Sequence, residues 1–225
     1  MKKYAVIVAG GTGSRMNSNI PKQFLLIKNK PVLFYTIDVF LKAYDDMHVI
    51  LVLPEDHVRK GQEVIDAYFD SSRITICEGG RTRFHSVQNG LSFITEESII
   101  FVHDGVRCLL TKDLIERCYI QAKKSGSAIP AITSRDSVRL LTIDGHVAVD
   151  RNTVKLVQTP QTFHSKILLT AFKIDYKDKF TDEATVVEAF GIKVNLIEGE
   201  ENNIKITVPG DIFIAEQMIT DVSSI

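Results

Sequence analysis

The feature that most constrains the fold is an unbroken apolar run from Tyr4 to Ala9, which ends at the glycine-rich segment Gly10 to Met16. A short apolar run that is partly β-branched and bounded by glycine is typical of a strand buried on both faces. Such a strand belongs to a parallel sheet that helices cover on both sides. Three glycines at its carboxyl end let the backbone approach a ligand and turn N–H groups toward an anion. The run therefore predicts a parallel sheet with an anion site beside its first strand.

The same alternation continues along the chain. Apolar runs predict further strands, and apolar residues at helical spacing predict the helices between them. Thr111 suits the N-cap of one helix, while Pro31 and Pro209 suit the first turn of two others. The pattern predicts a doubly wound, mostly parallel, Rossmann-like α/β sheet. We expect strands at 48–53, 74–77, 99–102, 127–132, 192–197 and 204–207, and helices at 31–43, 59–69, after 83, from 111, from 165, after 183 and from 209.

The segment from Ser137 to Asp150 breaks this alternation. It alternates weakly around Asp144-Gly145, a dipeptide that is typical of a hairpin turn. It is too short and too polar at its tip to be another unit of the core. We interpret residues of about 136–151 as a β-arm inserted into a single domain that spans 1–225. An ordinary surface hairpin is the alternative that the residues alone leave open.

The composition excludes several classes of protein. An apolar fraction of 44% in 225 residues suffices for one domain with a core, and a net charge of −1 gives no global attraction for nucleic acid. The three cysteines lack Cys-x-x-Cys spacing, so neither a disulfide framework nor a structural zinc site is expected and a reducing cytoplasm fits. The six histidines show no metal-ligand spacing. We expect neither a signal peptide nor a membrane-spanning helix, since no apolar run approaches roughly 18 residues.

The first glycine segment matches neither of two familiar nucleotide-binding loops. A P-loop requires Lys-Ser or Lys-Thr after its glycine pair, and the dinucleotide fingerprint requires a glycine where Met16 stands. In an open parallel sheet, ligands bind outside the carboxyl ends of the strands. Several loops that follow predicted strands should therefore meet at one edge: residues 10–22, 79–86, 104–107, and Thr159 with Gln161.

Arg15 and Lys22 are the candidate catalytic residues at this edge, because both follow the first glycine segment closely. An arginine can bridge two phosphate oxygens, and a lysine supplies a movable point charge. Transfer at the α-phosphorus of a nucleoside triphosphate requires mainly stabilisation of phosphate charge. The two cations predict a site for a polyphosphate that reacts, with a solvated basic pair on a loop as the alternative.

Two further groups of residues have more than one interpretation. Asp104 follows a predicted strand, where an acid can cap a turn, bind polyol hydroxyls or help to place a divalent metal. Gly79, Gly80 and Ser86 can read the edge of a pyrimidine through main-chain groups and one hydroxyl, or they can serve only as a helix cap. No Ser-His-Asp arrangement is visible, so hydrolysis has no support.

The ordered motifs resemble one family. Gly-Gly-x-Gly-x-Arg-Met followed by Pro21-Lys22-Gln23 resembles the signature of nucleotidyltransferases that join a CTP-derived nucleotide to a polyol phosphate. The resemblance is strongest to the 2-C-methyl-D-erythritol 4-phosphate cytidylyltransferases of the non-mevalonate isoprenoid pathway. It extends from residue 4 to about 215 and implies the nucleotide-diphospho-sugar transferase type of sheet. Matching blocks are His103-Asp104-x-x-Arg107, Val149 to Asn152, Gln158 to Gln161 and Asn203 to Thr207.

The resemblance implies a role for each matching position. The catalytic residues would be Arg15 and Lys22, and Asp104 would bind polyol hydroxyls. The residues implied to bind CTP are Ala9, Gly10, Gly11, Gly13, Gly79, Gly80, Ser86 and Gly105. Those implied to bind the polyol phosphate are Asp104, Arg107, Ser137, Arg151, Thr159 and Lys205. Thr181-Asp182-Glu183-Ala184 also matches the family, and we assign it a structural capping role.

The resemblance also implies a cofactor and a partner. Mg²⁺ would be bound mainly through the CTP triphosphate, with no metal site made by the protein itself. The chain would form a homodimer through the β-arm, with Arg151 reaching the neighbour's substrate phosphate. Cys108 stands where the family usually has proline, which would loosen the turn after Asp104. The alternatives are a ribitol-5-phosphate cytidylyltransferase, which shares several of the motifs, and a nucleotide-sensing module without turnover.

Overall fold

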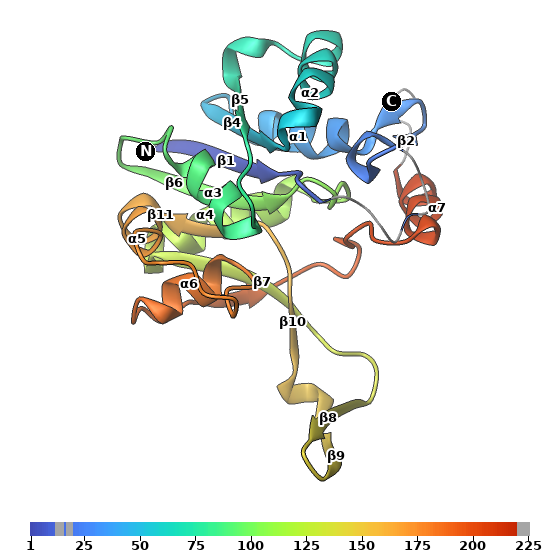
Figure 1. The fold of residues 1–225 in the computed structure, drawn as a ribbon, viewed down its shortest axis with the longest axis vertical. Helices are drawn as coiled ribbons and strands as arrows, with labels where there is room; N and C mark the ends of the chain where they lie inside the picture. The colour runs from blue at the N-terminus through green and yellow to red at the C-terminus, as the bar shows by residue number, and fades with distance from the viewer. Residues whose placement is uncertain (12–15, 17–19, 220–225) are drawn as a thin grey trace.

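The computed structural model describes residues 1–11, 16 and 20–219. Within these residues, eight strands form one central sheet (Figure 1). Its strands are β1 (Lys2–Val8), β4 (Met47–Leu53), β5 (Ile74–Glu78), β6 (Ser98–Asp104), β7 (Ser127–Thr133), β10 (Lys155–Val157), β11 (Gln161–His164) and β12 (Leu196–Glu198). A separate small pair, β2 (Leu26–Ile27) with β3 (Lys30–Pro31), precedes the first helix.

The order of strands is β10-β7-β11-β6-β1-β4-β5, and β12 also pairs with β7. Strand β1 lies parallel to both β4 and β6, and β4 lies parallel to β5. Strand β11 is antiparallel to both of its neighbours. The prediction of a doubly wound, mostly parallel sheet is confirmed. Because β1, β4, β5 and β6 share one direction, the loops that follow them meet at one edge of the sheet.

Helices cover both faces of the sheet. On β4, Val49 and Leu51 pack into a core that contains residues of α1, α2 and α4. Ile50 and Val52 pack into a second core with residues of α3, α5 and α6. Alternate side chains of a strand point to opposite faces, so each inner strand must be apolar throughout. The helices are α1 (Val32–Ala43), α2 (Glu55–Tyr68), α3 (Arg83–Leu91), α4 (Lys112–Ser125), α5 (Ser165–Ala171), α6 (Glu183–Ala189) and α7 (Pro209–Met218).

Short polar side chains determine where two of these helices begin. Thr111 Oγ1 accepts a hydrogen bond from the backbone N–H of Leu114 at 3.1 Å and caps α4. Asp182 Oδ1 accepts one from the N–H of Thr185 at 2.9 Å and caps α6. Both bonds satisfy N–H groups that have no partner inside the helix. The predicted capping roles of Thr111 and of the 181–184 segment are confirmed.

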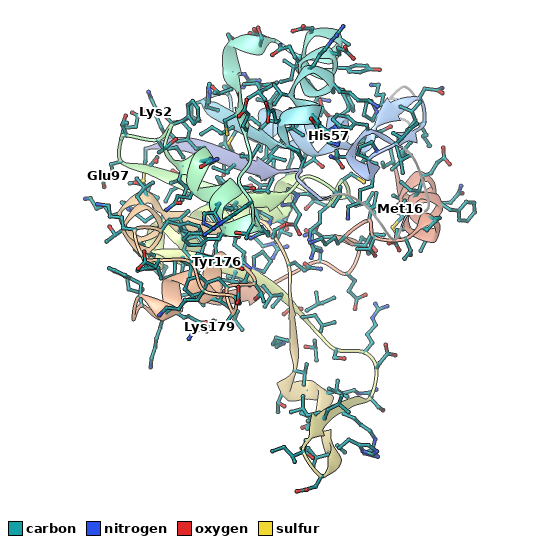
Figure 2. The ribbon with its side chains drawn as sticks, viewed as in Figure 1. Lys2, Met16, His57, Glu97, Tyr176 and Lys179 are labelled. Carbon is teal, nitrogen blue, oxygen red and sulfur yellow. The ribbon has the colours of Figure 1, made fainter. Side chains whose placement is uncertain are left out.

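The segment that interrupts the alternation forms a hairpin of its own. Strands β8 (Val138–Thr142) and β9 (Gly145–Val149) pair antiparallel. The two turn residues are Ile143 and Asp144, so the predicted Asp144-Gly145 dipeptide lies at the turn, with Gly145 as the first residue of β9. The hairpin extends away from the body of the molecule (Figure 1). Figure 2 shows that its side chains lie apart from those that fill the space between sheet and helices.

Two strand predictions near the carboxyl end were wrong in part or entirely. Of the predicted strand 192–197, only Leu196 and Ile197 lie in a strand, β12, which ends at Glu198. Residues 204–207 form no strand; the backbone N–H of Ile206 donates to the carbonyl of Val106 at 3.0 Å, an isolated bond. The side chains of Asn203 and Lys205 instead contact residues near the end of β6. No helix in the described part of the chain is long and apolar enough to cross a membrane.

Candidate active site

A cavity of about 660 Å³ opens at the carboxyl edge of the sheet. The loops after β1, β4, β5 and β6 line it, together with the segment that leads into α7. The structure thus brings together the loops that the sequence placed at this edge. Predicted site residues that line the cavity are Ala9, Gly10, Gly11, Lys22, Gly79, Gly80, Ser86, Asp104 and Lys205.

The end of β1 is fixed on both sides before the glycine segment begins. The N–H of Ala9 donates to the carbonyl of Val52 at 2.9 Å, and Gln23 Nε2 donates to the carbonyl of Ala9 at 2.8 Å. The N–H of Gly105 donates to the carbonyl of Val8 at 2.9 Å. A Cβ at Gly105 would lie only 2.8 Å from the Cβ of Ala9, so only glycine permits this close approach. Gly105 therefore supports the cavity floor rather than lining it.

The glycine segment itself is described only at its start. Gly10 and Gly11 line the cavity, and a Cβ at Gly10 would meet no heavy atom within 4 Å of the described part of the chain. Gly13 and Arg15, two of the predicted site residues, lie outside the described residues. The open space beside Gly10 leaves room for a ligand to approach the backbone.

Lys22 is placed by a short 3₁₀ turn, Lys22–Phe24, that follows Pro21. The N–H of Phe24 donates to the carbonyl of Pro21 at 2.9 Å, which closes the turn. Lys22 is only 8% exposed, and its Nζ donates to the carbonyl of Ile206 at 2.9 Å. The ammonium group of Lys22 therefore lies at the wall of the cavity, where a lysine can supply a movable point charge.

The second glycine loop is tight because the first turn of α3 packs on it. The N–H of Gly80 donates to Ser86 Oγ at 3.0 Å, and that hydroxyl donates to the carbonyl of Thr82 at 3.0 Å. A Cβ at Gly80 would lie 2.4 Å from the Cβ of His85 and 3.0 Å from its carbonyl carbon. Gly80 is therefore required for packing, whatever the loop binds. Gly79 and Ser86 also line the cavity beside it.

Asp104, the last residue of β6, lies among three cations. Its Oδ2 is 2.9 Å from Lys205 Nζ and 3.6 Å from Arg107 Nε, and its Oδ1 is 3.3 Å from Arg83 Nη2. Burial by itself raises the pKa of Asp104, but Arg83, Lys205 and Arg107 together outweigh it and keep the pKa well below its usual range. Asp104 is therefore ionised at neutral pH.

Arg107 and Thr159 lie behind Asp104 and do not line the cavity. Arg107 Nη1 donates to the carbonyl of Asn203 at 2.7 Å, and Asn203 Nδ2 donates to the carbonyl of Thr159 at 2.8 Å. Thr159 Oγ1 accepts the backbone N–H of Asp104 at 3.1 Å. These contacts fix the backbone that carries Asp104 and join it to the segment that carries Lys205.

His103 completes this network in a neutral form. Its Nε2 is 3.2 Å from the carbonyl of Arg107 and its Nδ1 is 3.0 Å from Thr159 Oγ1. A carbonyl can only accept, so Nε2 carries the proton and the Thr159 hydroxyl donates to Nδ1. Burial lowers the pKa of His103 to about 3. The ring is fully buried, and it packs edge-on against Phe40 with the ring centroids 5.3 Å apart.

Because His103 is buried in its neutral form, we expect the free energy of unfolding to depend on pH in the acid range. In the unfolded chain the imidazole titrates near pH 6.5, so between about pH 6.5 and 3 the unfolded state binds one proton more than the folded state. The free energy of unfolding should therefore fall with decreasing pH, by about 1.4 kcal/mol per pH unit from this residue.

Urea unfolding of the wild type and of His103→Asn between pH 7 and 4 tests this expectation. The quantity compared is the slope of the free energy of unfolding against pH, which should be smaller for His103→Asn. The exposed His146→Asn is the control and should keep the wild-type slope; equal slopes for all three proteins would contradict the expectation.

Comparison with known proteins places the chain in a family. The family model described as 2-C-methyl-D-erythritol 4-phosphate cytidylyltransferase matches residues 4–221. The chain belongs to this family. It is therefore a nucleotidyltransferase, as the motifs of the glycine segment, Pro-Lys-Gln and the residue 103–107 block predicted.

Relatives and solved structures agree with this assignment. A 2-C-methyl-D-erythritol 4-phosphate cytidylyltransferase from Phocaeicola vulgatus is 45% identical over 219 residues, which covers 97% of this chain and 100% of the relative. The crystal structure of 4-diphosphocytidyl-2C-methyl-D-erythritol synthase from Anaerococcus prevotii has a TM-score of 0.82 at 28% identity, covering 96% of this chain and 95% of the other. The bifunctional IspDF from Campylobacter jejuni has a TM-score of 0.79 at 28% identity, and the match covers 94% of this chain and 53% of that longer one.

Two predicted site residues of this cytidylyltransferase lie away from the cavity of their own chain. Arg151 lines a second cavity of about 410 Å³ near the base of the hairpin, and its Nη1 donates to the carbonyl of Arg135 at 2.8 Å. Ser137 is exposed and directly precedes β8. Neither residue lines the main cavity, so within one chain neither joins Lys22 and Asp104.

Cys108 leaves the turn after Asp104 intact. The N–H of Arg107 donates to the carbonyl of Asp104 at 3.0 Å. Cys108 is buried in an apolar cluster that includes Met16 and Ile206, and burial raises the pKa of its thiol to about 12. Met16 lies beside α7 (Figure 2). Cys108 therefore fills space as a small apolar residue would.

Sequence reasoning missed several charged residues of the site, two of which form an ion pair. Arg83 lines the cavity and contacts Asp104, and Glu183 at the start of α6 pairs with Arg83. Arg83 lies in the loop predicted at residues 79–86, and Glu183 lies in the segment to which we assign a capping role. Arg83 had a detectable signal, because it follows Gly79-Gly80 within a loop placed at the ligand edge. Glu183 belongs to a segment that matches the family, but its pairing with Arg83 had no signal, because only the tertiary structure brings two residues 100 positions apart into contact.

Proposed function

We propose that the chain transfers CMP from CTP to 2-C-methyl-D-erythritol 4-phosphate. A phosphate oxygen of the polyol phosphate attacks the α-phosphorus of CTP. The bond from the α-phosphorus to the bridging oxygen breaks, and pyrophosphate leaves with its electron pair. The product is 4-diphosphocytidyl-2-C-methyl-D-erythritol. The observation that carries the proposal is that one cavity is lined by both glycine loops and by Lys22, Asp104 and Lys205.

The triphosphate binds at the first glycine segment. Gly10 and Gly11 offer backbone N–H groups beside Ala9, and Lys22 offers positive charge. The family resemblance adds Gly13 and Arg15, which lie outside the described residues. Lys22 exchanges the carbonyl of Ile206 for a phosphate oxygen when CTP binds, since its Nζ already lies at the cavity wall. Charge on the non-bridging oxygens and on pyrophosphate grows as the bond breaks, so these cations stabilise the transition state more than the ground state.

The cytosine binds at the second glycine loop. Gly79 and Gly80 have no side chains, and the loop is closed by its own hydrogen bonds to Ser86. The N–H groups of Gly79 and Gly80 are already bonded to the Leu53 carbonyl and to Ser86 Oγ, so the loop is fixed beside the cavity and presents its carbonyl oxygens as main-chain acceptors. We assign to Gly79, Gly80 and Ser86 the recognition of the pyrimidine edge, with Gly105 supporting the floor below.

The polyol phosphate binds at the Asp104 side of the cavity. An ionised carboxylate accepts hydrogen bonds from polyol hydroxyls. Lys205 has 41% of its side chain exposed and presents positive charge to the substrate phosphate. Arg107 and Thr159 do not line the cavity. They affect this substrate indirectly, because their hydrogen bonds fix the positions of Asp104 and of the 203–205 segment.

Mg²⁺ enters with the triphosphate as part of the substrate, and it neutralises phosphate charge when bound. The carboxylate of Asp104 is already paired with three cations, so it is not needed as a ligand for the ion. This pairing fits an ion that is bound through the phosphate oxygens. The described residues contain no cluster of three or more His, Cys, Asp and Glu side chains that could hold an ion.

The hairpin provides a surface for a homodimer. Leu140, Leu141, Ile143 and Val147 of the β8–β9 segment are 55%, 86%, 104% and 50% exposed. An isolated two-stranded hairpin is marginally stable in water, and burial against a second copy would cover these side chains. A two-fold dimer would also bring Ser137 and Arg151 of one subunit toward the cavity of the other.

Nucleotide selectivity tests the proposed function. CTP should support pyrophosphate release with 2-C-methyl-D-erythritol 4-phosphate at least about 100-fold better, in kcat/KM, than ATP or GTP, because a loop built to pair with one base edge leaves polar groups unpaired with another. A reaction without polyol phosphate measures background hydrolysis. Equal release with ATP would refute the assignment of the second glycine loop. Preference for ribitol 5-phosphate would favour the ribitol alternative, and CTP binding without release would favour a nucleotide-sensing module.

A further inference from the structure

The wall of the cavity contains an ion pair that the proposed reaction does not use. Arg83 is the first residue of α3, and Glu183 is the first residue of α6. Arg83 Nη1 donates to Glu183 Oε1, and Arg83 Nη2 donates to Glu183 Oε2 at 3.1 Å. Two parallel hydrogen bonds fix the plane of the guanidinium group.

Glu183 is mounted on the central sheet through Gln161. Gln161 Oε1 accepts the N–H of Ala184 at 2.8 Å, and its Nε2 donates to Asp182 Oδ2 at 2.8 Å. Gln161 lies on β11, opposite Val102 of β6. The start of α6 is thereby fixed relative to the strand whose last residue is Asp104. Only 1% of the Glu183 side chain is exposed.

Arg83 also contacts the residue that we assign to the polyol. Its Nη2 donates to Asp104 Oδ1 at 3.3 Å, while Lys205 Nζ lies 2.9 Å from the other oxygen, Oδ2. With a cation at each oxygen, the carboxylate has one preferred rotation about its last bond, which is otherwise a soft torsion. The direction of the Asp104 lone pairs therefore depends on where Arg83 lies, and Arg83 lies where Glu183 fixes it.

A purely structural role does not account for this arrangement. A buried ion pair adds little net stability compared with well-packed apolar side chains, because both charges lose their hydration. An apolar contact between α3 and α6 would join them equally well. It would not reach Asp104 with an N–H group of fixed direction.

We propose that Arg83 and Glu183 are positioning residues, which orient the carboxylate of Asp104 for binding of the polyol phosphate. The proposal rests on the proposed role of Asp104. In this proposal, the side chain of Glu183 does not touch the substrate. It affects the substrate through its contact with Arg83 and through the contact of Arg83 with Asp104.

The test compares Glu183→Gln with the wild type at saturating CTP. Glutamine keeps the size of the side chain and removes its charge, so Arg83 loses one of its two fixed hydrogen bonds. The KM for the polyol phosphate should rise about tenfold, the scale of one hydrogen bond to a charged group. The dissociation constant for CTP, measured by calorimetry, should change less than about twofold. The control Asp46→Asn removes the Lys3–Asp46 ion pair at the amino edge of the sheet and should change neither value.

Non-additivity separates a positioning role from a structural one. Asp104→Asn should raise the polyol phosphate KM by itself, and Glu183→Gln should add little in the Asp104→Asn background, because it acts through Asp104. Additive losses, or equal weakening of CTP and polyol phosphate binding, would overturn the positioning role. If Asp104→Asn itself leaves the polyol phosphate KM unchanged, the proposed role of Asp104 fails; if only Glu183→Gln has no effect, the positioning pair alone fails.

A second pair of variants covers the case in which Glu183→Gln does not fold. Arg83→Lys keeps the positive charge but lacks the planar fork that makes two parallel hydrogen bonds to Glu183, so it should show the same selective rise in polyol phosphate KM. Glu183→Asp keeps the carboxylate and should recover part of the loss. Thermal unfolding of each variant reports how much folded protein is present. Folded Arg83→Lys with wild-type KM for the polyol phosphate would overturn the proposal.

Discussion

The Lys22→Ala variant is expected to carry out nucleotidyl transfer about 10²-fold more slowly than the wild type, or slower still. The reason is that Lys22 lines the cavity beside the first glycine segment, where the triphosphate is proposed to bind. Its charge acts most strongly when negative charge develops on the phosphate oxygens and on departing pyrophosphate. Single-turnover measurements of product formation with saturating CTP and 2-C-methyl-D-erythritol 4-phosphate isolate this step.

Binding of CTP should survive the same substitution. Backbone N–H groups of the glycine segment bind the triphosphate independently of Lys22, so the dissociation constant should change less than the rate. Lys22→Met keeps the length of the buried side chain and should show the same loss of rate, which separates charge from packing. Lys42→Ala removes a lysine of the exposed pair with Asp38 on α1 and should behave as the wild type. Near-normal turnover of Lys22→Ala would refute the catalytic assignment.

Mixed dimers of two inactive variants are expected to regain activity, because we propose that each site takes residues from both subunits. Lys22→Ala removes a residue that lines the cavity of its own chain, whereas Arg151 lies at the base of the hairpin and lines a different cavity. If the hairpin carries Arg151 to the neighbouring cavity, a dimer of Lys22→Ala with Arg151→Ala has one site with both lesions and one intact site. Neither homodimer has an intact site.

The two variants are mixed in equal amounts and allowed to exchange subunits at random. About a quarter of all sites in the mixture should then be intact. Activity is compared before and after exchange, and tags of different mass on the two variants measure the fraction of mixed dimers. A mixture of Lys42→Ala with wild type controls for the effect of exchange itself. If mixed dimers form and activity does not return, Arg151 serves its own chain and the shared site is excluded, while the family assignment is unaffected.

The sequence by itself determined the inner parallel strands, the helices and the edge at which the loops meet. Short, largely apolar runs precede Gly10, Gly79 and Asp104. This pattern follows from burial of a strand on both faces of a sheet. The cap at Thr111 and the turn at Asp144-Gly145 were also predictable, because each depends on neighbours within a few residues. Parallel strands then bring their loops together without further information.

The tertiary structure decided which charged side chains meet at the site and which way they face. Residues 204–207 look like a strand because they alternate, yet Asn203 and Lys205 turn toward Thr159 and Asp104 instead of pairing with a neighbouring strand. The Arg83–Glu183 pair joins the starts of two helices, and each residue alone looks like an ordinary member of a loop or cap. The pKa of His103 is lowered by complete burial, which no neighbour in the sequence imposes. Local patterns encode elements because their energetics are local, whereas ion pairs and burial depend on contacts between distant segments that form only when the sheet and its helices are assembled.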